Sequence, residues 1–144
     1  MMKRIFFALT ALSLSSTTLA LPTQANSSYI KLKAPSAQEC DRFADQVSKT
    51  LNTKMNVRTN DQLNDQTSNA GGETCHVWAT LKGSRYGDPN AKVQAMLRQS
   101  GWKEDKQNTT MFYKGRKLVV VGIERELVNR QPVYYVNLSL AIRQ

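Results

Sequence analysis

The chain has 144 residues, of which 40% are hydrophobic and 22% are charged, and its formal net charge is +9. This length suits one domain with one modest hydrophobic core. The positive charge favours an anionic partner, such as an acidic protein or an anionic polymer. The basic residues are scattered and form no block of five or six, so nucleic acid is not an expected partner.

The first 25 residues have the pattern of a cleavable secretion signal. A basic start precedes the apolar stretch 5–14, whose ten residues are too few to span a bilayer. Small residues then allow cleavage after Ala20 or after Ala25, and we favour Ala25 because a polar segment follows it. We therefore expect an exported, periplasmic or extracellular domain over residues 26–144, with no transmembrane segment after processing. An N-terminal anchor that is never cut is the alternative.

Two cysteines, Cys40 and Cys75, remain after the expected cleavage. In an oxidising compartment, an even number of cysteines in a small domain indicates a disulfide. The bridge would close a loop of about 36 residues, which stabilises a fold by roughly 3–4 kcal/mol. A metal pair or a catalytic thiol is the alternative, but a metal site needs more ligands than two cysteines and one histidine.

The first half of the chain contains one clear helix signal. Ser36 and Glu39 form a capping box, and apolar residues follow at helical spacing as far as Leu51. Residues 26–35 predict an extended lead-in with at most a short strand. The stretch 52–74 is rich in Asn, Asp, Gln, Thr and Gly, and we expect it to be a long polar loop.

Residues 75–82 alternate as a strand does. One set of side chains faces the helices, and the other set, with His76 and Trp78, faces the opposite way. A second helix is expected to begin after Asp88 and to end at Gly101.

The C-terminal third predicts three strands, over 109–113, 117–126 and 133–143, joined by tight turns into an antiparallel meander. Strand 75–82 can join the edge of this meander. The order α-β-α-β-β-β therefore predicts an α+β domain. Its two helices pack on one face of an antiparallel sheet of about four strands, and one disulfide links the layers.

The sequence contains no recognisable catalytic set. His76 is the only histidine, and its neighbour Cys75 points to the other face of a strand, so the two cannot form a nucleophile–base pair. No serine lies in a GxSxG setting. Glu124 and Glu126 share a strand face, but a solvated strand end accounts for them. We expect no enzymatic activity, no cofactor and no bound metal.

Two surfaces are candidates for binding. Trp78 and His76 share the outer sheet face with Tyr135, and large aromatic side chains are typical of binding surfaces; the alternative is that Trp78 packs under the long polar loop. Arg85 and Tyr86 lie between two glycines on a short loop whose tip can project. An ordinary connection is the alternative for this loop.

Together these features favour an exported, non-enzymatic binding or inhibitory module of the cell envelope. Its partner would be another protein or an anionic envelope polymer. Proteins that neutralise a hydrolase or toxin are similar in size and compartment, and that analogy alone suggests an inhibitory role. A minor enzyme or a carrier of an apolar ligand is one alternative, with a cavity lined by Met96, Val119, Val121 and Leu138. An accessory subunit of an envelope complex is another, with 133–143 as an edge strand that accepts a partner strand.

Overall fold

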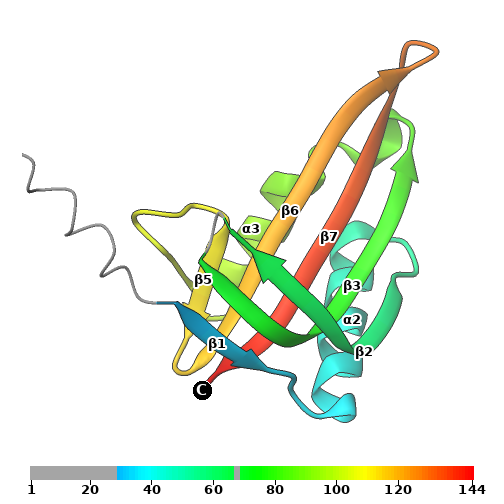
Figure 1. The fold of residues 1–144 in the computed structure, drawn as a ribbon. Coiled ribbons are helices and arrows are strands. Elements are labelled where there is room, and N and C mark those ends of the chain that lie inside the picture. The colour runs from blue at the N-terminus through cyan, green and yellow to red at the C-terminus, as the bar shows by residue number, and fades with distance from the viewer. Residues whose placement is uncertain (1–28, 67–68) are drawn as a thin grey trace, which may run out of the picture.

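The computed structural model describes residues 29–66 and 69–144 and has an α+β fold (Figure 1). A seven-stranded sheet carries two α-helices in this part of the chain, and one disulfide joins Cys40 to Cys75. The expected class and the disulfide are confirmed, whereas the expected four strands and their order are wrong. No helix among the described residues is both long and apolar enough to cross a membrane. The predicted secretion signal, residues 1–25, lies outside them.

Each half of the chain contributes one helix and several strands. The first half contains β1 (Ile30–Lys33), α2 (Ala37–Leu51), β2 (Asn56–Asp65) and β3 (Ala70–Lys82). The second half contains the 3₁₀ turn η2 (Ser84–Tyr86), α3 (Pro89–Gln99), β4 (Lys103–Glu104), β5 (Met111–Lys114), β6 (Lys117–Val128) and β7 (Gln131–Arg143). Both helix starts are capped as predicted: Ser36 accepts a hydrogen bond from the Glu39 amide at 3.2 Å, and Asp88 accepts one from the Ala91 amide at 3.1 Å.

The strand order in the sheet is β2-β3-β1-β7-β6-β5-β4. β3 pairs directly with β7 from Cys75 to Lys82, so strand 75–82 does join the C-terminal meander. Beyond that stretch the two strands separate, and β1 lies between them, parallel to β3 and antiparallel to β7. The expectation that 133–143 is an edge strand is therefore wrong, because β6 pairs with one side of β7 while β3 and β1 occupy the other. β7 has no free edge to offer a partner strand.

The stretch 52–74 is not a loop, because most of it forms a hairpin between β2 and the first half of β3. β2 lies at the edge of the sheet, and most of its side chains are exposed. An edge strand with little buried surface needs no apolar alternation. Polar side chains and a bulge between Arg58 and Asp61 also protect such an edge from pairing with another chain.

The main core lies between the sheet and the two helices, which cover the same face (Figure 1), and a second buried cluster, which includes Leu32, Leu118 and Ala141, is separate from it. The disulfide ties the buried side of α2 to β3, with 5.6 Å between the Cα atoms of Cys40 and Cys75, and both cysteines are fully buried. The side chains proposed as the lining of an internal cavity are Met96, Val119, Val121 and Leu138. All four are buried in the main core cluster, where they pack with the helices and strands. They are therefore part of the packing that stabilises the domain.

The β6–β7 hairpin projects beyond the end of β3 (Figure 1). Asn129 and Arg130 form its turn, and both have positive φ angles, of 52° and 67°. A two-residue turn with this geometry strongly prefers glycine at its second position, which Arg130 occupies here. Leu127 and Val128 beside the turn are 63% and 43% exposed. The tip therefore carries a strained arginine next to two exposed apolar side chains.

We expect Arg130→Gly to raise the free energy of unfolding by about 1 kcal/mol, because glycine adopts positive φ without the steric cost that an L side chain meets. Urea denaturation measures the change. Arg125→Gly, on the exposed part of β6, is the matched control and is expected to lower stability instead, because glycine weakens a strand. Equal shifts in the same direction for the two variants would contradict strain at Arg130.

Candidate functional site

The sheet has one face free of helices in the described part of the chain. α2 and α3 lie behind the sheet (Figure 1), and its other face is buried at Leu118 of β6 and Ala141 of β7 but partly open at His76 and Trp78 of β3. On β3 the buried residues Cys75, Val77 and Ala79 point toward the helices, so His76 and Trp78 point to this uncovered face. This placement confirms the orientation predicted from the alternation.

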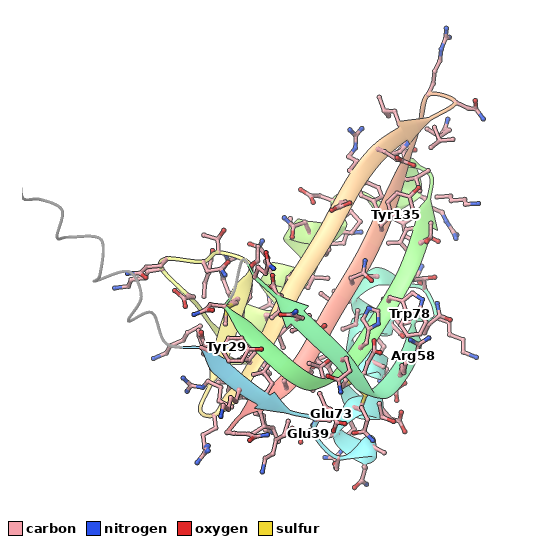
Figure 2. The ribbon with its side chains drawn as sticks, in the orientation of Figure 1. Tyr29, Glu39, Arg58, Glu73, Trp78 and Tyr135 are labelled. Atoms are coloured by element: carbon pink, nitrogen blue, oxygen red, sulfur yellow. A yellow bond between two sulfur atoms is a disulfide. The ribbon has the colours of Figure 1, made fainter. Side chains whose placement is uncertain are left out.

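Five side chains from three strands meet on the uncovered face, and we call them the sheet-face cluster. They are Arg58 and Asp61 of β2, His76 and Trp78 of β3, and Asn137 of β7. The rings of His76 and Trp78 stack with 4.7 Å between centroids and 20° between planes. The guanidinium carbon of Arg58 lies 5.2 Å from the indole centroid, a cation–π distance. Figure 2 shows Arg58 and Trp78 close together, with Tyr135 farther along toward the hairpin.

His76 connects the three strands of the cluster. Its Nδ1 atom lies 3.0 Å from a carboxylate oxygen of Asp61, and its Nε2 atom lies 3.0 Å from the amide oxygen of Asn137. Asp61 also forms an ion pair with Arg58 at 3.5 Å. These contacts fix the ring against which Trp78 stacks and so restrict the orientation of the indole.

The bulge in β2 brings Arg58 and Asp61 onto the same face. Arg58 pairs with His76 and Asp61 pairs with Thr74, so three steps along β2 match two steps along β3. Residues three apart on a regular strand would point to opposite faces. The extra residue, at a bulge where Asn60 has a φ of 55°, restores the alignment. The bulge therefore supplies both charged residues of the cluster.

A cleft of about 640 Å³ lies farther along the same face, next to the projecting hairpin. Its lining includes Thr80, Lys82, Glu126, Val128, Val133 and Tyr135. The Tyr135 hydroxyl donates a hydrogen bond to the Glu126 carboxylate. That hydrogen bond raises the pKa of Tyr135 above its usual value, with smaller contributions from desolvation and the carboxylate charge. The phenol therefore stays protonated at neutral pH and keeps this bond across β6 and β7.

The second predicted surface has a different geometry from the one expected. Tyr86 is only 8% exposed and belongs to the core, so the expectation that it projects is wrong. Gly83 and Gly87 have positive φ angles of 108° and 67°, and the short turn between them packs the tyrosine inward. Arg85 remains exposed, covers the Tyr86 ring at 4.6 Å and donates a hydrogen bond to its hydroxyl. The structure thus groups His76, Trp78 and Tyr135 on one face and leaves Arg85 and Tyr86 apart from them.

The sequence analysis missed Arg58 and Asp61, because both lie in the segment expected to be a loop. A polar edge strand lacks the apolar alternation that marks other strands, and its bulge leaves no periodic signal.

Ser139 lies opposite His76 in the β3–β7 register. The Nε2 atom of His76 nevertheless faces Asn137, and no hydrogen bond between His76 and Ser139 is present in the described part of the chain. Within that part, no group of three His, Cys, Asp or Glu side chains is arranged to hold a metal ion.

Comparison with known proteins gives no match, since no protein-family model, curated protein or solved structure is significantly similar to this chain. A function must therefore be inferred from the geometry of the chain itself.

Proposed function

We propose that the protein is an exported, non-catalytic binding module that holds a second protein on the uncovered face of its sheet. The observation that carries this proposal is the grouping of His76, Trp78 and Tyr135 on a face that no described helix covers. Aromatic residues are enriched among those that contribute most binding energy in protein interfaces. A half-buried Trp on a rigid sheet supplies contact area at low entropic cost.

The sheet-face cluster is organised before binding. Stacking on His76 and the contacts of Arg58 and Asp61 already restrict the side chains that a partner would otherwise have to immobilise. Restricting them in advance lowers the entropy cost of association. A preorganised aromatic cluster is therefore better suited to recognition than the same residues on a mobile loop.

The mixture of charges on this face favours a protein over a polyanion. Arg58 and Lys82 are cationic, whereas Asp61 and Glu126 are anionic, and they lie among aromatic and apolar side chains. A uniformly anionic polymer would be repelled by the two carboxylates, while a protein surface can complement both signs. The exposed Leu127 and Val128 beside the cleft add an apolar contact at the hairpin tip. A projecting tip of this kind also suits the inhibitory subtype, in which it would enter a cleft of the bound protein.

Affinity capture with the oxidised protein, against envelope extract and secreted hydrolases and read by mass spectrometry, identifies the partner. We then expect Trp78→Ala to weaken binding of that partner by roughly 30-fold, the effect of losing a central interface aromatic. Isothermal titration calorimetry measures the affinity. Urea denaturation of the free variant is expected to show a much smaller change in stability, because Trp78 lies on the partly exposed face.

Arg85→Ala is the control, because Arg85 is exposed but packs against Tyr86 away from the cluster. Unchanged affinity for Arg85→Ala beside a large loss for Trp78→Ala supports the sheet-face site. Loss of stability equal to the loss of binding in Trp78→Ala would make Trp78 a structural residue. Loss of binding only in Arg85→Ala would move the contact to the η2 turn.

A further inference from the structure

A second hollow, of about 520 Å³, lies where β1, the start of β6 and the end of β7 meet. Tyr29, Ile30, Lys31, Arg116, Arg143 and Gln144 line it. Three of these six side chains are cationic, and none of the six is an Asp or Glu side chain. Tyr29 marks this region in Figure 2, far from Tyr135 and the projecting hairpin. The hollow is therefore separate from the sheet-face cluster and its cleft.

Neutral groups hold the two arginines in place. The Nε and Nη2 atoms of Arg116 donate to the main-chain carbonyl of Arg143 at 3.3 and 3.0 Å. The Nη2 atom of Arg143 donates to the carbonyl of Gly115 at 2.8 Å, and its guanidinium lies 4.9 Å from the centre of the Tyr113 ring. The Nε atom of Arg143 is buried and has no hydrogen-bond partner among the described residues. These contacts bring no negative charge to either guanidinium.

Three cations elsewhere among the described residues, Arg58, Arg98 and Lys117, are paired with carboxylates. Arg98 pairs with Glu104 at 2.7 Å, and Lys117 pairs with Glu39. None of the ion pairs within residues 29–66 and 69–144 involves Lys31, Arg116 or Arg143. Like charges held together without a counter-charge repel one another, and an anion placed among them relieves that repulsion.

We propose that this hollow is a binding site for a phosphate-class oxyanion, with Arg116, Arg143 and Lys31 as its ligands. A guanidinium presents a planar set of donors that matches the oxygens of a phosphate group, and an ammonium adds a compact point charge. The site is independent of the proposed protein-binding face. It gives the protein a means of engaging a phosphate-bearing component of its surroundings.

Isothermal titration calorimetry at low ionic strength, with inorganic phosphate as the probe and the protein in its naturally processed form, tests the site. We expect saturable binding of one phosphate per chain. Arg116→Gln is expected to weaken it by at least about tenfold, because the variant loses a charge-assisted hydrogen bond. Arg116→Lys keeps the charge but loses the planar donors, so an intermediate loss is expected.

Lys31→Gln is the second test variant, and Arg125→Gln is the matched control. Lys31 is exposed and its side chain makes no described contact that supports the fold, so its replacement tests the site even if an arginine variant fails to fold. Arg125→Gln removes one exposed charge from the distant hairpin and is expected to leave phosphate binding within about twofold of wild type, since remote charges are screened. Equal weakening in all variants would show diffuse attraction to a basic protein and overturn the site. Absence of saturable binding would overturn it as well.

Two further probes identify the source of the phosphate group. Vesicles of phosphatidylglycerol, compared with vesicles of phosphatidylcholine, test a lipid headgroup, and glycerol phosphate tests a soluble or polymer-borne ester. Binding to anionic vesicles that Arg116→Gln reduces assigns the lipid source. Binding to glycerol phosphate but to neither vesicle assigns the soluble source. Vesicle binding that Arg116→Gln and Arg125→Gln reduce equally would contradict a role for the site in membrane contact.

Discussion

Replacing both Cys40 and Cys75 with alanine is expected to lower the free energy of unfolding by roughly 3–4 kcal/mol. The disulfide joins residues 35 positions apart, so its loss gives the unfolded chain the entropy of an open loop. A small domain has only about 5–15 kcal/mol of stability in total, so the bridge is a large share of it. Urea denaturation of the double variant and of the oxidised wild type, compared at the same pH, measures the difference.

The reduced wild type provides the control for this prediction. Reduction with dithiothreitol should lower the stability of the wild type toward that of the double variant and leave the double variant unchanged. A loss below about 1 kcal/mol would mean that packing of α2 against the sheet, and not the cross-link, holds this part of the fold. Cys75 lies directly before His76 on β3, so the same double variant should also weaken capture of a partner by the sheet-face cluster.

The parts of the fold that could be predicted are those in which a local sequence pattern is compatible with only one structure. Ser36 and Glu39 identified the start of α2 because capping depends on local hydrogen bonds. The alternation over 75–82 placed His76 and Trp78 on the face opposite the core because a strand has a strict period of two. The disulfide followed from a count of two cysteines. None of these inferences required knowledge of long-range pairing.

The parts that could not be predicted depend on which strands meet. β1 is short, and its place between β3 and β7 is fixed by partners distant in sequence. β2 reads as a loop because an edge strand exposed on most of its surface carries polar residues. The side-chain contact between Asp61 and His76 depends on the β2 bulge, which has no periodic signature. Glycine on both sides of the η2 turn permits either direction of the Tyr86 side chain, so its burial does not follow from the local sequence.

Gly72→Ala is expected to lower the free energy of unfolding by roughly 3 kcal/mol, from both steric overlap and backbone strain. A Cβ atom at this position would lie 2.2 Å from the carbonyl oxygen of Leu32, which is the partner of Gly72 in the β1–β3 ladder. The φ angle of Gly72 is +137°, a value that L side chains rarely adopt. The neighbouring strand must move to admit a methyl group, because the nearest atoms belong to its backbone. Urea denaturation measures the loss.

Gly122→Ala on β6 is the matched control for Gly72→Ala. Its added Cβ would lie 3.6 Å from the backbone oxygen of Asn137, an ordinary contact, so stability should stay the same or rise by about 0.5 kcal/mol. The two variants also separate the two binding surfaces. β1 carries Lys31 into the phosphate hollow, so displacing it through Gly72→Ala should weaken phosphate binding, whereas Gly122→Ala should not. If Gly72→Ala lowered stability no more than Gly122→Ala, β1 would not be held tightly between β3 and β7, and the hollow that depends on it would lose its structural basis.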